Sequence, residues 1–344
     1  MLRLTLMALL VGCGGSKDGD GGDDTSLFTP GGLPATGGGG GGTGGGGTST
    51  PTPTDCVDDG FDPIRPLVEP EQGDFEGFPW IRHIPESPKA VVFLFHGSSG
   101  EIGNLTGLHY IRTYNAWTAA GIGYVATEST DRRTGSWDGS TVDPDRNDDM
   151  PRIAALRDDV IANTAMTEDT PVFGWGFSNG GGYSEDFAIM AEELGWPVRG
   201  FMVHSSSALR GAELPGLFTS GENDDITPST RNSYERHDEL GQPSEWYEHL
   251  EVPFTPQHAM LHAAYDAELA QDVFDDMVDF GLIDADGTRL VPLNEVESAM
   301  RAYSNNSLVP GADRVTPIIR VAWATHRPSS EFACEERDFI LRHR

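Results

Sequence analysis

The sequence predicts an α/β domain with a mostly parallel central sheet and helices on both faces. Short apolar runs that suit strands alternate with segments that suit helices, which is the pattern of such sheets. The strand-like runs are 90–95, 122–127, 171–175, 198–203 and 217–220, and helix candidates include 151–166 and 183–194 between them and 330–343 at the end. Strands that are apolar throughout are expected where both faces of a sheet are buried.

The first 55 residues are expected to lie outside this domain. Residues 1–13 hold one positive charge, a short apolar stretch and then Cys13, which is typical of an export signal. Residues 14–55 are mostly Gly, Ser, Thr, Asp and Pro, a composition that buries little apolar surface and predicts a disordered tether. The remaining chain, 56–344, is long enough for one α/β domain with a large core.

The end of the export signal suggests a lipid anchor. Leu10-Val11-Gly12-Cys13 resembles the bacterial lipobox, in which the cysteine becomes the lipidated first residue of the mature protein. Gly14 after this cysteine resembles lipoproteins that are sorted to the outer membrane. The resemblance implies an exported lipoprotein at the outer membrane or cell surface of a Gram-negative bacterium, attached to the membrane by that anchor alone.

The net charge excludes one class of partner. The chain has 23 Lys and Arg against 54 Asp and Glu, a formal net charge of −31. Acidic residues spread over the whole domain predict a solvated surface and argue against binding to nucleic acid or anionic lipid. No nucleic-acid partner is therefore expected, and we expect a monomer.

The most informative motif is Gly176-Phe177-Ser178-Asn179-Gly180, because it stands between a predicted strand and a predicted helix. In a G-x-S-x-G turn the strained serine backbone lifts Oγ clear of the sheet, and there is no room for β-carbons at the flanking positions. The chain has 43 glycines, so this pattern alone is weak. Its position between strand and helix favours Ser178 as a nucleophile.

Polar residues follow two other predicted strands, where ligands of such sheets bind. His96-Gly97-Ser98 comes after the first strand, and Gly221-Glu222-Asn223-Asp224-Asp225 comes after the last. With the G-x-S-x-G motif, these turns resemble the α/β-hydrolase superfamily. The resemblance implies an oxyanion hole formed by the backbone N–H groups of Ser98 and Asn179. It also implies a catalytic acid at Asp224, for which Asp225 is the alternative.

The superfamily order of serine, acid and histidine requires a histidine after Asp224, and two fit. His258 follows a strand-like run and a turn at an ordinary spacing from the acid, whereas His326 follows the apolar run 317–325 and precedes the terminal helix. Between them lies a predicted helical insertion, about 255–310, with Leu269, Val273 and Met277 on one helical face. We take His326 as the general base, with His258 as the alternative.

These residues together predict a serine hydrolase that cleaves a carboxylic ester through an acyl-enzyme. Gly-Phe-Ser-Asn-Gly-Gly is similar to the motif of secreted polyhydroxyalkanoate depolymerases and feruloyl esterases, which implies a polyester or aromatic ester substrate. A peptidase of the same fold and a non-catalytic tethered binding protein are the alternatives. No cofactor is expected. No metal is expected either, because the acidic run 143–148 has Asp148 where a calcium loop requires Gly.

Three cysteines occur in the chain. If Cys13 carries lipid, Cys56 and Cys334 remain, one near each end of the domain. In an exported protein, these two are expected to form a disulfide that ties the start of the domain to its terminal helix.

Overall fold

The computed structural model describes residues 64–344. The predicted signal peptide (1–13) with Cys13, the tether (14–55) and Cys56 lie outside the described residues. Cys334 lies near the start of the last helix, and its predicted disulfide with Cys56 stays a prediction.

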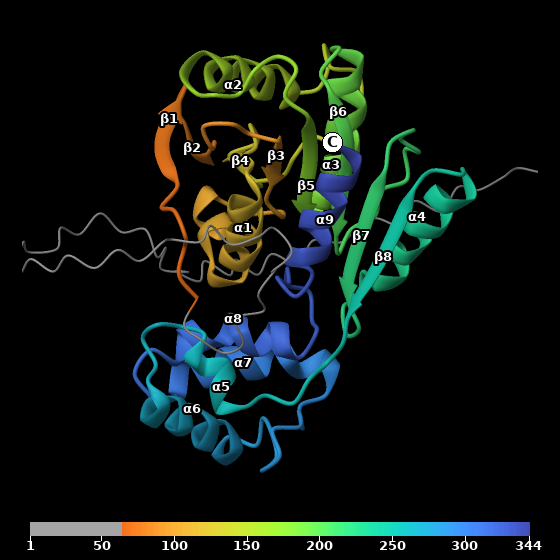
Figure 1. The fold of residues 1–344 in the computed structure, drawn as a ribbon. Coiled ribbons are helices and arrows are strands. Elements are labelled where there is room, and N and C mark those ends of the chain that lie inside the picture. The colour runs from red at the N-terminus through yellow and green to blue at the C-terminus, as the bar shows by residue number, and fades with distance from the viewer. Residues whose placement is uncertain (1–63) are drawn as a thin grey trace, which may run out of the picture.

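An eight-stranded sheet forms the centre of the molecule (Figure 1), in the order β1-β2-β4-β3-β5-β6-β7-β8. The first strand pairs, β1 with β2 and β2 with β4, are antiparallel, and all other pairs are parallel. The strands are β1 (Glu71–Phe75), β2 (Phe78–His83), β3 (Ala90–Phe95), β4 (Ile122–Thr127), β5 (Val172–Phe177), β6 (Val198–His204), β7 (Gly216–Gly221) and β8 (Ser244–His249). This order, with helices on both faces, is the α/β-hydrolase fold that the sequence predicts.

The five predicted strands are confirmed as β3 to β7, each buried over nearly its whole length. The hairpin β1–β2 was not among the predicted strands, because β1 is short, polar and mostly exposed and gives no apolar run. Its turn places Glu76 at a positive φ of 55°.

Helices cover both faces of the sheet and form one hydrophobic core on each. One core joins α2 and α3 to the sheet, and the other joins α1 and α9 to the opposite face. The helices are α1 (Leu108–Ala120), α2 (Met150–Asn163), α3 (Asn179–Glu193), α4 (Thr227–Glu239) and α9 (Ala333–His343), with a 3-10 turn, η1 (Ile102–Thr106), before α1.

Four further helices form a separate layer at the end of the sheet where the parallel strands finish (Figure 1). They are α5 (Pro256–Met260), α6 (Ala267–Asp279), α7 (Val296–Asn306) and α8 (Ala312–Ala322), with a 3-10 turn, η2 (Leu293–Glu295), before α7. We call this layer the helical insertion. It has a hydrophobic core of its own, which includes Phe254, Val273, Met277 and Trp323. The insertion continues to Ala322, beyond the predicted limit near residue 310, because the apolar run that starts at Pro317 belongs to α8.

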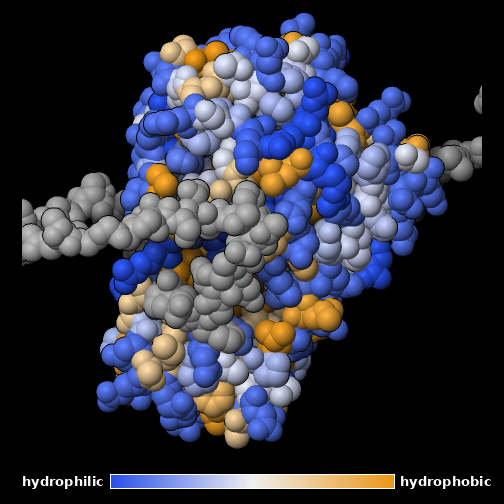
Figure 2. Space-filling view, in the orientation of Figure 1, coloured by the Kyte–Doolittle hydropathy of each residue, from blue (hydrophilic) through white to orange (hydrophobic). Residues whose placement is uncertain are grey.

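The surface is mainly hydrophilic on the face that Figure 2 shows, with separate apolar spots. Several large apolar side chains of the insertion are exposed, including Phe280, Leu290, Leu293 and Leu308. Within residues 64–344, no helix combines the length and the apolar character that a membrane span requires.

The terminal helix brings a carboxyl group beneath the centre of the sheet. Glu336 of α9 is fully buried and accepts a hydrogen bond of 3.1 Å from the indole Nε1 of Trp175 in β5. Its other carboxyl oxygen lies 3.5 Å from Nε2 of the buried His204. Burial raises the pKa of Glu336 well above its ordinary value and lowers the pKa of His204 to about 3, so burial favours the neutral form of both groups.

We predict that Glu336 makes stability depend on pH. Because its pKa is higher in the folded than in the unfolded protein, the free energy of unfolding is largest below the ordinary pKa of 4.5 and falls as the pH rises above it. Glu336→Gln keeps the acceptor for Trp175 and flattens this fall. Urea unfolding between pH 4 and pH 8 measures it, with Glu235→Gln on the exposed side of α4 as the control. Equal slopes for wild type and Glu336→Gln would contradict the assignment.

Candidate active site

Ser178 occupies a strained turn between the central strand β5 and helix α3. Its backbone has φ 55° and ψ −125°, a conformation that L-residues rarely adopt. The Ser178 N–H donates to the carbonyl of His204 at the end of the neighbouring strand β6, at 2.9 Å. The turn therefore projects the serine from the carboxyl edge of the sheet, as the G-x-S-x-G pattern predicts.

The flanking glycines are required by packing. A β-carbon at Gly176 would overlap the carbonyl of Gly180, and one at Gly180 would overlap the carbonyl oxygens of Phe95 and His96 at the end of β3. Both contacts are with backbone, which cannot swing away as a side chain can. The close approach of α3 to the sheet thus depends on the absence of side chains at these two positions.

His326 and Asp224 complete a hydrogen-bonded row with Ser178. His326 Nε2 lies 3.0 Å from Ser178 Oγ, and His326 Nδ1 lies 2.9 Å from Asp224 Oδ2. The order serine, histidine and carboxylate, with the histidine in the middle, is the geometry of a nucleophile, its base and the group that orients the base. The structure thus brings together the three side chains selected from the sequence.

The environment of Asp224 favours the carboxylate form. Burial by itself raises the pKa of this carboxyl, but hydrogen bonds from His326, from the Ile226 N–H and from the Ser205 hydroxyl outweigh burial and leave the pKa below its ordinary value. The Ile226 N–H donates to Asp224 Oδ1 at 2.9 Å. An ionised Asp224 can hold the proton of His326 on Nδ1, which leaves Nε2 free to accept a proton from Ser178.

The two predicted oxyanion donors lie on the turns that flank Ser178. Asn179 is the first residue of α3, where a backbone N–H has no acceptor within the helix. Ser98 follows Gly97, at which a β-carbon would lie only 3.2 Å from Cβ of Ser178. The His-Gly turn therefore packs directly against the serine, with Ser98 as its next residue.

His96 stabilises this turn through hydrogen bonds of its imidazole ring. Its ring is buried, Nδ1 donates to the carbonyl of Gly97 at 2.8 Å, and Nε2 accepts from the N–H of Ser129 at 3.2 Å. Burial lowers the pKa of His96 to about 4, which agrees with a ring that donates at one nitrogen and accepts at the other. We conclude that His96 orients the Ser98 turn.

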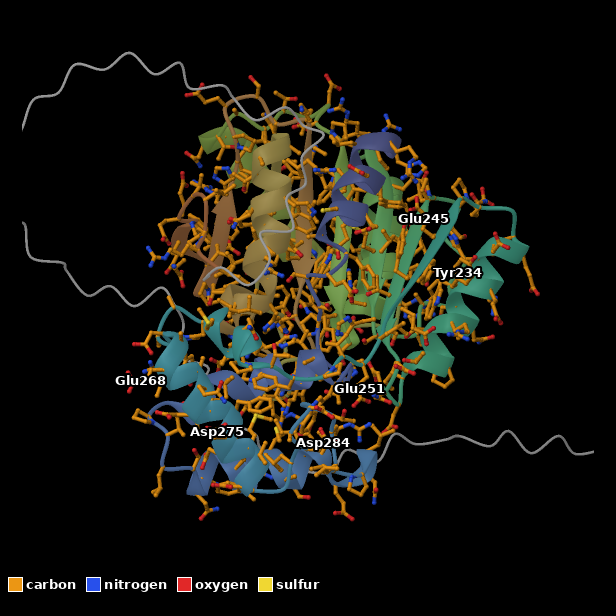
Figure 3. All side chains as sticks on the ribbon, turned by 60° about the horizontal axis from the view of Figure 1, so that its bottom comes forward. Tyr234, Glu245, Glu251, Glu268, Asp275 and Asp284 are labelled. Carbon is orange, nitrogen blue, oxygen red and sulfur yellow. The ribbon has the colours of Figure 1, made fainter. Side chains whose placement is uncertain are left out.

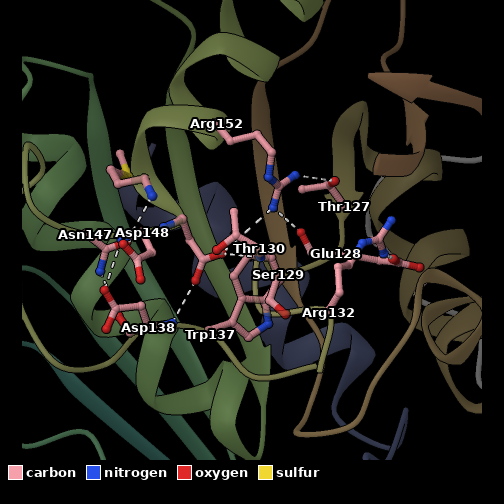
Figure 4. A network of polar contacts seen from close by, with 12 residues as sticks. Thr127, Glu128, Ser129, Thr130, Arg132, Trp137, Asp138, Asn147, Asp148 and Arg152 are labelled. Carbon is pink, nitrogen blue, oxygen red and sulfur yellow. Dashed lines mark hydrogen bonds and ion pairs between the residues drawn. The ribbon is translucent and has the colours of Figure 1, made fainter. Parts of the chain in front are cut away.

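The loop after β4 forms a further wall of the site. The buried Asp149 accepts hydrogen bonds from Thr130 and from the N–H of Asp138, and Arg152 donates to Thr127 and to the carbonyl of Glu128 (Figure 4). This network places Trp137, whose N–H donates to Asn179 Oδ1 at 2.7 Å and whose indole donates to the carbonyl of His96 at 3.0 Å. No sequence motif marks Trp137, so this role could not be predicted from the sequence.

The alternative candidates lie elsewhere. His258 is in α5, where its Nδ1 accepts from the N–H of Thr255 at 3.0 Å, and its ring stacks on Phe254. Its ring therefore belongs to the insertion, and its Nδ1 caps α5. Asp225 is exposed. Among residues 64–344 no group of His, Cys, Asp and Glu is arranged to hold a metal ion.

A polar groove of about 370 Å³ adjoins the turn that carries Ser178. Its lining includes Asn179, Ser206, Ser207, Asp186 and Arg210. Burial raises the pKa of Asp186 to about 7, although the nearby Arg210, at 3.1 Å, opposes the shift. The groove offers hydrogen-bonding groups next to the turn that carries Ser178.

No family model and no curated protein matches the chain. Solved structures that resemble it include an arylesterase (12% identity over 55% of this chain and 78% of that one, TM-score 0.38) and a ferulic acid esterase (12%, 52% and 88%, TM-score 0.41). Another is an ester-hydrolase from the metagenome of Lake Arreo (13% identity, 67% of this chain and 88% of that one, TM-score 0.43). These likenesses assign no substrate to this chain, and its α/β-hydrolase fold follows from the strand order and the helical layers.

We predict that Gly180→Ala destabilises the fold although it lies in a helix. In a helix, alanine is more favourable than glycine by roughly 1 kcal/mol. A net loss of stability in Gly180→Ala therefore reports the clash of the added β-carbon with the carbonyl oxygens of Phe95 and His96. We expect a net loss of about 1–3 kcal/mol in the free energy of unfolding, measured by urea titration. Gly103→Ala, in η1 with open space around the added carbon, is the matched control. Equal stability of the two variants would contradict the packing argument.

Proposed function

We propose that the protein is a serine hydrolase that cleaves carboxylic esters. One observation carries the proposal: Ser178 Oγ, the His326 ring and the Asp224 carboxylate form a continuous hydrogen-bonded row at the carboxyl edge of the sheet. A serine hydroxyl becomes a nucleophile when an adjacent base accepts its proton as it attacks.

The reaction follows from these contacts. Ser178 Oγ attacks the ester carbonyl carbon while His326 Nε2 takes the Oγ proton, and Asp224 stabilises the imidazolium through Nδ1. The carbonyl oxygen becomes an oxyanion that accepts hydrogen bonds from the N–H groups of Ser98 and Asn179. His326 returns the proton to the leaving alcohol. Water then attacks the acyl-enzyme by the same route and releases the acid.

The finer assignments are also proposals. The Gly-Phe-Ser-Asn-Gly-Gly motif supports an ester of a polyester or of an aromatic acid. The first 55 residues support an exported lipoprotein that is anchored through Cys13 and carries the domain on a tether, and Cys56 with Cys334 supports a disulfide in that domain.

We predict that Ser178→Ala removes ester hydrolysis. Loss of the nucleophile in a unit of this kind lowers kcat by about 10⁶-fold. Release of p-nitrophenol from the acetate and butyrate esters measures this. If wild type shows no turnover above the Ser178→Ala background, the protein is a binding protein rather than an esterase. If wild type cleaves only peptide amides, it is a peptidase.

Two pairs of variants, each with a control of the same residue type, test the roles of His326 and Asp224. We expect His326→Ala to lower kcat by about 10⁶-fold and Asp224→Asn by about 10⁴-fold. His258→Ala and Asp225→Asn, the neighbouring candidates of the same residue types, are expected to retain kcat. Steady-state kinetics with p-nitrophenyl butyrate decides, and a loss confined to His258→Ala would transfer the role of base to that residue.

A further inference from the structure

His326 does not follow a strand of the sheet. It follows α8, the last helix of the insertion, after a short connection that starts at Trp323. Trp323 is fully buried in the core of the insertion, and Ala324 has a positive φ of 52°. The position of the histidine ring therefore depends on how this connection, Trp323 to Thr325, is held against the sheet domain.

Asn223 binds this connection at two adjacent carbonyls. Its backbone N–H donates to the carbonyl of Ala324 at 3.0 Å, and its side-chain Nδ2 donates to the carbonyl of Trp323 at 2.9 Å. Gly221, two residues earlier, approaches so closely that a β-carbon there would overlap the Ala324 carbonyl. The turn 221–224 thus contains the acid, Asp224, and also hydrogen-bonds to the segment that precedes the histidine.

The amide of Asn223 is itself oriented by a carboxylate. Its second N–H donates to Glu251 Oε2 at 2.6 Å. Glu251 lies between β8 and the insertion (Figure 3) and accepts two hydrogen bonds from Arg289 of the insertion, at 3.0 and 2.8 Å. The two side chains are only 25% and 13% exposed, so solvent screens this pair weakly. A polar chain therefore runs from the insertion through Arg289, Glu251 and Asn223 to the connection before His326.

We propose that Asn223 is a positioning residue for His326, and that Glu251 and Arg289 couple the placement of the insertion to it. The inference rests on the proposed role of Ser178 as a nucleophile. The hydrogen bonds of Asn223 go to the carbonyls of Trp323 and Ala324 and to Glu251, so Asn223 acts on the backbone between α8 and the His326 ring.

The expected signature is a loss of kcat without a loss of substrate affinity. A misplacement of about 1 Å in a catalytic group can cost about 10²-fold in rate. We expect Asn223→Ala to lower kcat by about that factor while KM stays near the wild-type value. Asn223→Asp has nearly the same shape but lacks the amide donors, so it is expected to lose as much activity as Asn223→Ala. Asn163→Ala, at an exposed asparagine of α2, is the matched control and should retain kcat.

The coupling is tested by a double-mutant cycle with Glu251. Glu251→Ala removes the acceptor of both Asn223 and Arg289, and we expect roughly a 2- to 30-fold fall in kcat. In the Asn223→Ala background the same change should have no further effect, because both changes act through one contact. Independent, multiplying losses would overturn the coupling between the insertion and His326.

The experiment uses the full chain, with kcat and KM for p-nitrophenyl butyrate, the rate of Ser178 labelling by a fluorophosphonate, and the melting temperature of each variant. Slow labelling of both Asn223 variants at a wild-type melting temperature supports the proposal. Wild-type kcat in Asn223→Asp overturns it, even where Asn223→Ala fails to fold. If wild-type protein does not react with the fluorophosphonate at Ser178, the proposed function fails and this inference fails with it.

Discussion

The strained backbone of Ser178 is the constraint on which the site depends. Five non-glycine residues of the described chain have positive φ, and four of them, Ser99, Ser178, Ser205 and Ala324, lie on the connections that surround the site. Such conformations cost about 1–3 kcal/mol each and persist only where the surrounding structure enforces them. Here the enforcement is backbone packing, since Gly176 and Gly180 bring α3 against β5 and the end of β3.

Burial favours the neutral forms of three ionisable side chains around the reacting groups, with Asp224 as the contrast. Burial lowers the pKa values of His96 and His204 and raises that of Glu336, whereas the hydrogen bonds of Asp224 hold its pKa below the ordinary value. An ionised Asp224 that is hydrogen-bonded to Nδ1 stabilises the imidazolium form of His326. The large acidic surface of the chain is compatible with this site because solvent and salt screen it.

Much of the sheet and of its reactive edge could be predicted from the sequence, because strands buried on both faces are apolar throughout and the residues after them meet at one edge. The choice between His326 and His258 could not be derived in this way. The apolar run before His326 gives no indication whether it is a strand or a buried helix, and it forms α8. Asn223 and Trp137 were missed because their roles depend on backbone carbonyls and N–H groups that come close only in the folded chain.

His326 follows the last helix of the insertion in the chain. This connection limits how such a protein can change over evolution. In a layout where the histidine follows a strand, a covering layer can be exchanged while the reactive groups stay in place. Here the segment 256–322 covers the carboxyl edge of the sheet and also determines where the imidazole of His326 lies. The link between the two is Trp323, which belongs to the hydrophobic core of the insertion. The covering layer and the placement of the imidazole are therefore inherited together, and a transplanted layer would have to provide carbonyls that Asn223 can bind to hold the histidine in place.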